Sequence, residues 1–388
     1  MKILYYSWDE MICVDVMEAF KELDCQVRKV RFDHKSDFFD ADFQKYIEAC
    51  LTEEEYDFLF SINYIPVLAL AAFNKKIRYV SWVYDCPCGT MYSETIKSPY
   101  NIVFDFDEAE VLKFNSMNIN NVFHLPLAAS IDRMENTFSK AKEDNELYKN
   151  DIAFVAKISS DESYFKDVKD IYRGYLDAIV KSQSLLHGDE VVENFVKSAK
   201  GAEIAKYFNF EKNDTTIIRD CDLLEILVNR ELRRVDRLEI AKLLEDKVSK
   251  KFKTALYTDY DKEDFKDINK GVVDSYKGQY LVYKNSKINI NQTIRSIKSA
   301  INQRSVDILA CKGFLLTNYS HEAYRDLELK GACVIYYDYV DLERKIEYFM
   351  EHEEQRLEIA SKGYNFYKNN RTYKIVLGKM LEKVGKMW

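Results

Sequence analysis

The feature that most constrains the fold is a regular alternation of short apolar runs with amphipathic helices, which occurs twice along the chain. Helical periodicity at segments such as 14–23 and 38–51 separates the runs of the first block. Strands joined through helices need right-handed crossovers and form a parallel sheet. The sequence therefore predicts a Rossmann-like first domain over residues 1–127. Its strands are expected at 2–6, 26–32, 57–62, 77–83, 101–106 and 121–125.

The alternation restarts after a polar, charged connector at 128–150. A second Rossmann-like domain is expected over 151–370, interrupted by a long helical stretch at 163–247 in which apolar residues recur at spacings of three and four. The final segment, 371–388, is expected to form a helix that can cross back to the first domain. Strands are expected at 151–158, 253–257, 286–290, 314–316 and 333–336. A chain of 388 residues is long enough to bury two separate cores.

Charge and composition exclude several classes of protein. The chain has 57 basic and 65 acidic residues and a net charge of -8, which argues against a nucleic-acid partner. It contains no apolar run of roughly 18 residues, so no transmembrane segment is expected. Acidic residues interrupt the N-terminal apolar run at positions 9, 10 and 15, unlike a secretory signal. The 8 scattered cysteines favour free thiols in a cytoplasmic protein, and the oligomeric state, homo- or hetero-oligomer, stays open.

Ligands of open parallel sheets bind outside the carboxyl ends of the strands, so the residues that follow each strand are candidates for a site. In the first half, Asp85 is placed to accept a proton from an acceptor hydroxyl. The same residue also fits a turn aspartate before Pro87. The other candidates at these strand ends are Ser7, Trp8, Asp9, Asn63, Tyr64, Trp82 and Tyr84.

In the second half, Arg304 begins an expected helix that follows a strand. A helix N-terminus carries a positive dipole end, and a guanidinium can grip phosphate oxygens, so this position favours a diphosphate. A surface arginine in a solvated turn is the alternative. Glu322, at the start of a later helix, can bond ribose hydroxyls or simply favour the helix dipole.

Long segments of the chain resemble the CgeB-like glycosyltransferases. The resemblance lies in SKINININQTIRS, in RSVDILACKGFLLTNYSHE and in the tail that ends in RTY, together with NYIPVLALAAFNKKIRYVSWVYDCP and FHLPLAAS in the first half. It implies an α/β, GT-B-like fold of two Rossmann-like domains facing across a cleft. It also implies a nucleotide-sugar donor, with a UDP-sugar as the expected substrate, a hydroxyl acceptor on a protein or cell-surface glycan, and no bound metal or cofactor.

By matching position, the resemblance assigns Asp85 as the base and Arg304 as the group that holds the donor diphosphate. The remaining donor-side residues are then Lys287, Asn289, Asn291, Thr317, Asn318, Tyr319, Glu322 and Tyr257. The chain departs from the family at Ala156, Ala300, Lys312, Cys333 and Val376. Because glycines of the family are among the lost positions, a second hypothesis is a degenerate protein that partners an active glycosyltransferase or senses a nucleotide-sugar.

Other catalytic motifs are absent from the sequence. It contains no P-loop, no G-x-G-x-x-G, no H-E-x-x-H and no G-x-S-x-G. Asp105 and Asp107 form a D-x-D pair at a strand end, which can hold Mn²⁺ or Mg²⁺ but also arises by chance in an acidic chain.

Overall fold

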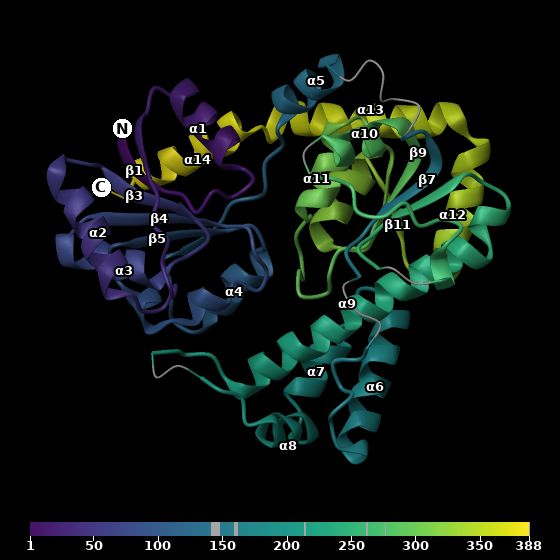
Figure 1. Ribbon diagram of the computed structural model, residues 1–388, viewed down its shortest axis with the longest axis horizontal. Coiled ribbons are helices and arrows are strands. Elements are labelled where there is room, and N and C mark those ends of the chain that lie inside the picture. The colour runs from purple at the N-terminus through teal and green to yellow at the C-terminus, as the bar shows by residue number, and fades with distance from the viewer. Residues whose placement is uncertain (141–147, 159–161, 213–214, 261–262, 276, 388) are drawn as a thin grey trace.

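The computed structural model describes residues 1–140, 148–158, 162–212, 215–260, 263–275 and 277–387. Two α/β domains lie side by side (Figure 1). The first contains a parallel six-stranded sheet in the order β2-β1-β3-β4-β5-β6. Its strands are β1 (Lys2–Tyr6), β2 (Gln26–Val30), β3 (Phe58–Ile62), β4 (Arg78–Val83), β5 (Asn101–Asp105) and β6 (Val122–His124). Its helices are α1 (Cys13–Glu22), α2 (Ala41–Glu53), α3 (Pro66–Lys75) and α4 (Glu108–Ser116).

The second domain contains a parallel five-stranded sheet in the order β11-β10-β9-β7-β8. Its strands are β7 (Asn150–Val155), β8 (Thr254–Tyr257), β9 (Ser286–Asn291), β10 (Leu315–Asn318) and β11 (Val334–Tyr336). The helices around this sheet are α10 (Gly278–Asn285), α11 (Gln303–Ala310), α12 (Tyr339–Glu351) and α13 (Glu353–Asn370). The predicted fold class, two parallel-sheet Rossmann-like domains, is confirmed.

The long helical stretch consists of separate helices that form their own apolar core below the second sheet (Figure 1). They are α6 (Asp170–Leu185), α7 (Val191–Val196), α8 (Ala199–Phe208) and α9 (Asp220–Asp246). The segment before α9 reaches the first domain, where the amide of Glu94 donates to the carbonyl of Thr215 at 2.8 Å. Lys113 of α4 also pairs with Asp222 of α9 at 3.1 Å. This stretch therefore connects the two domains a second time.

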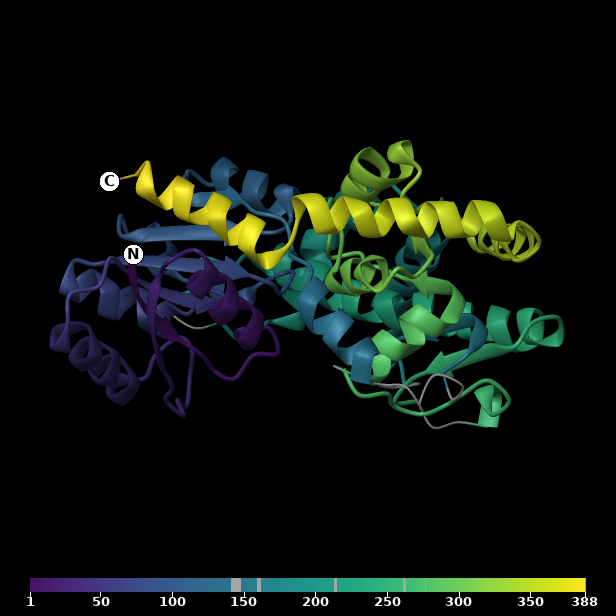
Figure 2. The same ribbon diagram turned by 90° about the horizontal axis from the view of Figure 1, so that it is seen from above.

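The last helix, α14 (Tyr373–Gly385), leaves the second domain and packs on the first (Figure 2). Val376, Leu377 and Met380 are fully buried there, in a core that they share with α1 and the first sheet. Each such side chain contributes about 1.5–3 kcal/mol by leaving water. The chain passes between the domains both before α5 (Ile131–Lys140) and before α14, and these two segments lie side by side. The amide of Ala129 in the first donates to the carbonyl of Arg371 in the second at 2.8 Å.

The segment predicted as a connector is partly helical. Residues Ile131–Lys140 form α5, because Ile131 and Met134 give it one apolar face that is buried in the core of the second domain. The connector between the two domains therefore contains a helix. Residues 141–147 of the expected connector lie outside the described residues.

The departures from the expected family pattern are mostly packing positions. Ala156, Ala300, Cys333 and Val376 are all buried among apolar neighbours. Lys312 has φ 60, a left-handed conformation that glycine adopts more readily, and its ammonium lies 4.5 Å from the centre of the Tyr364 ring. Gly313 is required, because a Cβ there would lie 2.8 Å from the carbonyl of Tyr283.

The thiols agree with the sequence analysis, since all eight cysteines are free. Five of them are buried in the cores of the two domains, at Cys13, Cys50, Cys88, Cys311 and Cys333. Across the part of the chain that the structure covers, no helix has both the length and the apolar character that a membrane crossing needs.

Candidate functional site

Each sheet has one point at which the strand order reverses. In the first sheet it lies between β1 and β3, and in the second between β7 and β9. At such a point the loops leave the sheet in opposite directions, so a crevice opens at the carboxyl ends of the strands. These two places are where the topology itself favours a ligand.

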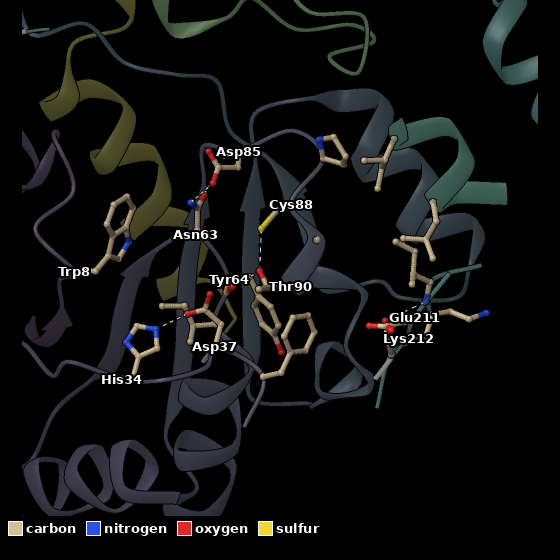
Figure 3. A pocket seen from close by; sticks show the side chains of 18 of the residues that line it. Trp8, His34, Asp37, Asn63, Tyr64, Asp85, Cys88, Thr90, Glu211 and Lys212 are labelled. Carbon is tan, nitrogen blue, oxygen red and sulfur yellow. Dashed lines mark hydrogen bonds and ion pairs between the residues drawn. The ribbon is translucent and has the colours of Figure 1, made fainter. Parts of the chain in front are cut away.

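A cavity of about 730 Å³ lies at the first of these points (Figure 3). Trp8 follows β1, Asn63 and Tyr64 follow β3, and Asp85 follows β4. The opposite wall comes from α9 and the segment before it, with Glu211 and Lys212 labelled there in Figure 3. The remaining lining residues are His34, Asp37, Phe38, Ile65, Pro87, Cys88, Gly89, Thr90, Thr216, Ile218, Leu223, Ile226 and Arg230.

Asp85 is held in position by Asn63. The side-chain amide of Asn63 donates to the Asp85 carboxylate at 2.8 Å, and its oxygen accepts the backbone amides of Tyr84 and Asp85 at 2.8 and 3.2 Å. Asn63 does this from a left-handed backbone with φ 59. Partial desolvation by the cavity walls raises the pKa of the Asp85 carboxyl, and the hydrogen bond from Asn63 opposes that rise. A raised pKa makes this carboxylate a stronger proton acceptor than an exposed aspartate.

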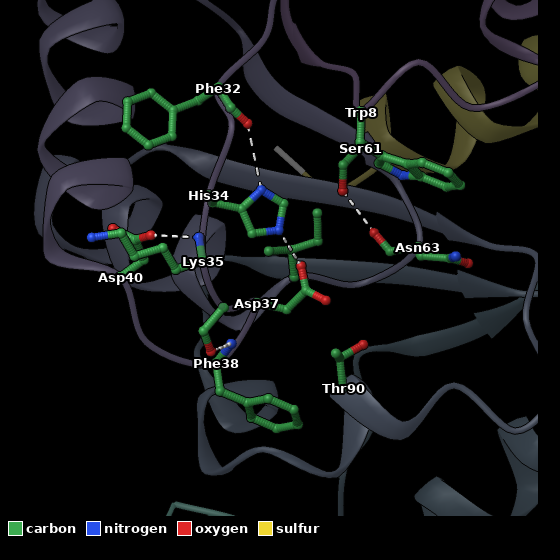
Figure 4. A network of polar contacts seen from close by, with 12 residues as sticks. Trp8, Phe32, His34, Lys35, Asp37, Phe38, Asp40, Ser61, Asn63 and Thr90 are labelled. Atoms are coloured by element: carbon green, nitrogen blue, oxygen red, sulfur yellow. Dashed lines mark hydrogen bonds and ion pairs between the residues drawn. The ribbon is translucent and has the colours of Figure 1, made fainter.

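His34 and Asp37 form a second polar pair in this cavity (Figure 4). The imidazole Nε2 lies 2.7 Å from the Asp37 carboxylate, and Nδ1 lies 2.9 Å from the hydroxyl of Tyr6. Both ring nitrogens of His34 are therefore engaged. Asp37 thus lies beside an imidazole, whereas Asp85 accepts a hydrogen bond from an amide and has no charged partner among the residues that the structure describes.

Two arginines lie near the reversal point of the second sheet. Arg237 of α9 is only 7% exposed and donates to the carbonyl of Lys157, just after β7. Arg304 lies in the first turn of α11, which follows β9. Burial and the neighbouring charge of Arg304 lower the pKa of Arg237 to about 9. In the described part of the chain neither guanidinium has a carboxylate partner, and the Nε atom of each is buried without a hydrogen bond.

Two neighbouring like charges that form no salt bridge within the described part of the chain favour the binding of an anion. A helix N-terminus adds its own positive end at Arg304. The second reversal point is therefore cationic, while the first carries carboxylates beside apolar side chains.

A family model described as glycosyl transferase-like matches residues 237–382, less than half of the chain, and includes both arginines. The sequence matches no curated protein significantly. Among solved structures, sucrose-phosphate synthase from Thermosynechococcus elongatus is similar, with a TM-score of 0.55, 8% identity and 100% of both chains covered. HepE from Anabaena in complex with UDP-glucose has a TM-score of 0.55, 11% identity and 100% of both chains covered. Trehalose 6-phosphate synthase from Burkholderia multivorans has a TM-score of 0.54 and 9% identity, over 100% of this chain and 98% of that one.

The fold is GT-B. These likenesses at low identity establish the two-domain architecture of this chain. At such low identity they do not identify the site residues, which are assigned from the geometry of this chain.

The GT-B fold brings some of the predicted donor-side residues together. The amide of Asn291 donates to the hydroxyl of Thr317 at 3.0 Å, and Asn318 accepts the amide of Thr293 at 2.7 Å. These contacts fix the loop after β9 at the carboxyl edge of the second sheet. Tyr319 lines a smaller neighbouring cavity of about 120 Å³.

Four predicted donor-side residues lie elsewhere. Lys287 starts β9 at the opposite, amino edge of the sheet, where it pairs with Asp151 at 2.8 Å. Asn289 is buried within the sheet and donates to the carbonyl of Tyr283. The hydroxyl of Tyr257 accepts from Asn150 inside the second core. The carboxylate of Glu322 accepts hydrogen bonds from the Arg371 guanidinium at 2.6 Å and from the backbone amide of Ile301 at 2.7 Å.

The acceptor-side predictions divide in the same way. Trp8, Asn63, Tyr64 and Asp85 line the first cavity. The others do not, because Ser7 is buried against Glu10, Asp9 pairs with Arg31 at the surface, Trp82 lies in the core, and Tyr84 contacts the Tyr373 hydroxyl at the domain junction. Side chains alternate between the two faces of a sheet, so residues next to a strand end, such as Trp82, can point into the core instead of the cavity.

The D-x-D pair has a structural role. Asp107 accepts the backbone amides of Lys298 and Ser299 at 2.6 and 3.0 Å, which joins the first domain to the loop after β9. Asp105 is buried and accepts the amide of Asp107. Across the described ranges, no three His, Cys, Asp or Glu side chains converge in a way that could hold a metal ion.

Sequence reasoning missed several residues that the structure places at the site. His34 follows β2, so the strand-end rule could have found it. Arg230 and Arg237 lie inside a long helix whose sequence shows only ordinary amphipathic periodicity, and nothing in it indicates which helix face meets the cleft.

Proposed function

We propose that this chain is a glycosyltransferase that moves a sugar from a nucleotide-sugar, most simply a UDP-sugar, to a hydroxyl group of a protein or glycan acceptor. The observation that carries the proposal is the position of Arg237 and Arg304 near the reversal point of the second sheet, where neither guanidinium forms a salt bridge with a carboxylate of the described residues. The glycosyl transferase-like match over 237–382 and the GT-B fold support it. HepE, which shares that fold, is titled as a complex with UDP-glucose.

On the donor side, negative charge develops on the leaving nucleoside diphosphate as the glycosidic bond breaks. Fixed guanidiniums aimed at that charge stabilise the transition state more than the ground state. We propose that Arg237 and Arg304, with the N-terminus of α11, supply this stabilisation and that no metal ion is needed. Asn291, Thr317 and Asn318 hold the adjoining loop in place.

On the acceptor side, we propose that Asp85 takes the proton of the attacking hydroxyl, with Asn63 orienting the carboxylate. This role applies to transfer with inversion. In transfer with retention Asp85 would only position the acceptor.

The test is a hydrolysis and transfer screen of UDP-, GDP- and other nucleotide-sugars with three proteins. The wild type should hydrolyse one class of donor slowly, and Arg304→Ala should lose about 100-fold or more in kcat/KM. Arg344→Ala removes an exposed arginine of α12 and serves as the matched control, with unchanged activity expected. A wild type that neither binds nor turns over any nucleotide-sugar would contradict the proposal and support the degenerate protein of the second hypothesis.

A further inference from the structure

The first cavity is built by both domains, and its two walls differ in chemistry. Trp8, Phe38 and Ile65 give the first-domain side an aromatic and apolar lining beside Asp85. Leu223 and Ile226 continue the apolar lining on α9. An apolar body in this space would therefore be enclosed from both sides.

One cation in this lining is unused. Lys212 pairs with Asp220 at 2.7 Å, whereas Arg230 has no hydrogen bond or ion pair among the described residues. Of the cavity carboxylates, Asp37 is paired with His34 and Asp85 is bound by Asn63, while Glu211 lies exposed on the wall formed by the segment before α9. Arg230 thus offers a free guanidinium to whatever fills the cavity.

Arg230 also belongs to a row. Residues 230, 233 and 237 of α9 are spaced by three and four, so they share one helix face with Leu223 and Ile226. The acidic residues between them point elsewhere, because Glu231 pairs with Arg234 and Asp236 pairs with Arg295. One face of α9 therefore runs from the apolar cavity to the arginine pair, with a guanidinium at each end.

The arginine pair already accounts for the two charges of a diphosphate, so Arg230 is surplus to the donor. We propose that the part of the protein or glycan acceptor that enters this cavity is an anionic hydroxyl-bearing group with an apolar body, whose hydroxyl faces Asp85 and whose carboxylate or phosphate binds Arg230. This inference rests on the proposed function and names the substrate class of its acceptor site. Opposite charges at the two ends of the cavity would fix the direction in which the acceptor enters.

The experiment compares matched probes by titration calorimetry on the full-length protein with UDP present, so that the arginine pair is occupied. The pairs are 4-hydroxybenzoate against 4-hydroxybenzamide and glycerol 3-phosphate against glycerol. The wild type should bind one anionic member about 10-fold or more tightly than its neutral partner. Whichever pair shows the larger difference identifies a carboxylate or a phosphate as the anion.

Arg230→Gln should abolish that preference without changing the affinity for UDP. Lys242→Gln, an exposed change near the far end of the same helix, should keep both. Equal affinity for charged and neutral probes in the wild type, no binding of any anionic probe, or an unchanged preference in Arg230→Gln would overturn the inference. Failure of UDP itself to bind the wild type would instead overturn the proposed function.

Discussion

The two reversal points occupy equivalent places in two similar parallel sheets, yet they differ in shape and charge. The first opens into a cavity of about 730 Å³ lined by aromatic and apolar side chains with carboxylates among them. The second is crowded by side-chain contacts, such as those of Asn291 and Asn318, and presents two arginines that form no salt bridge with the residues that the structure describes. The comparison teaches that the topology chooses where a ligand can lie, while the residues in the loops decide what it can be.

The helical stretch connects these two places. α9 supplies Leu223, Ile226 and Arg230 to the first and Arg237 to the second. Its N-terminal segment is fixed to the first domain through Thr215 and Asp222. The following predictions test whether the two places are as distinct in function as they are in chemistry.

The largest effect is expected when both arginines are changed. Arg237→Gln combined with Arg304→Gln should lower kcat/KM for donor hydrolysis by about 1000-fold or more, because both groups that face the leaving diphosphate lose their charge. Circular dichroism should show an unchanged fold. A double variant within about 10-fold of the wild type would show that the anion binds elsewhere.

Asp85→Asn should affect only the cavity at the first reversal point. Transfer to an acceptor is expected to fall by about 100-fold, since the amide cannot take up the proton. The affinity for UDP should stay the same, because the arginine pair is untouched. Measuring the transfer rate and the UDP affinity on one preparation separates the two effects, and a parallel loss of both would contradict the division.

A smaller effect is expected on the pH profile. The pKa of Asp85 is raised above the ordinary value of 3.8, so the acid limb of the transfer rate should lie above pH 3.8. Activity is lost as the pH falls through the raised pKa, because the base becomes protonated. Asn63→Gly removes the hydrogen bond that lowers this pKa and tolerates the left-handed backbone. The acid limb should therefore move to higher pH, whereas a shift to lower pH would exclude Asp85 as the titrating group.

The smallest effect on the site is expected from α14. Leu377→Ala should lower the free energy of unfolding by about 2–5 kcal/mol, because the side chain is fully buried in the first core. The affinity for UDP should change by less than about 2-fold, as expected for distant sites. Chemical denaturation and UDP titration check the two statements, and a large loss of UDP affinity would show that the C-terminal helix positions the donor side.

The sequence predicted the architecture well because strand–helix alternation determines a parallel sheet regardless of detail. It also placed Trp8, Asn63, Tyr64 and Asp85 after strands, and the structure brings these four residues to one cavity. It could not distinguish residues that line the cavity from residues that turn inward, such as Trp82, because that depends on the exact end of each strand.

The remaining errors have tertiary causes. Glu322 was assigned to a ligand, but Arg371 lies far along the chain and meets it only in the folded protein. Lys287 belongs to the segment SKININ, which spans the whole of β9. Its side chain therefore lies at the amino edge of the sheet, opposite the carboxyl edge where a ligand is expected. Arg237 was missed because its partner Arg304 and the carbonyl of Lys157 are brought to α9 by folding alone.

The most direct test of the central claim is the difference in binding between UDP and uridine, measured by calorimetry on the wild type and on Arg304→Gln. If the arginine pair holds the diphosphate, the wild type should bind UDP about 100-fold or more tightly than uridine, and most of that difference should vanish in the variant while uridine binds as before. If the variant keeps the full preference for UDP, the diphosphate does not lie at Arg304 and the account is wrong.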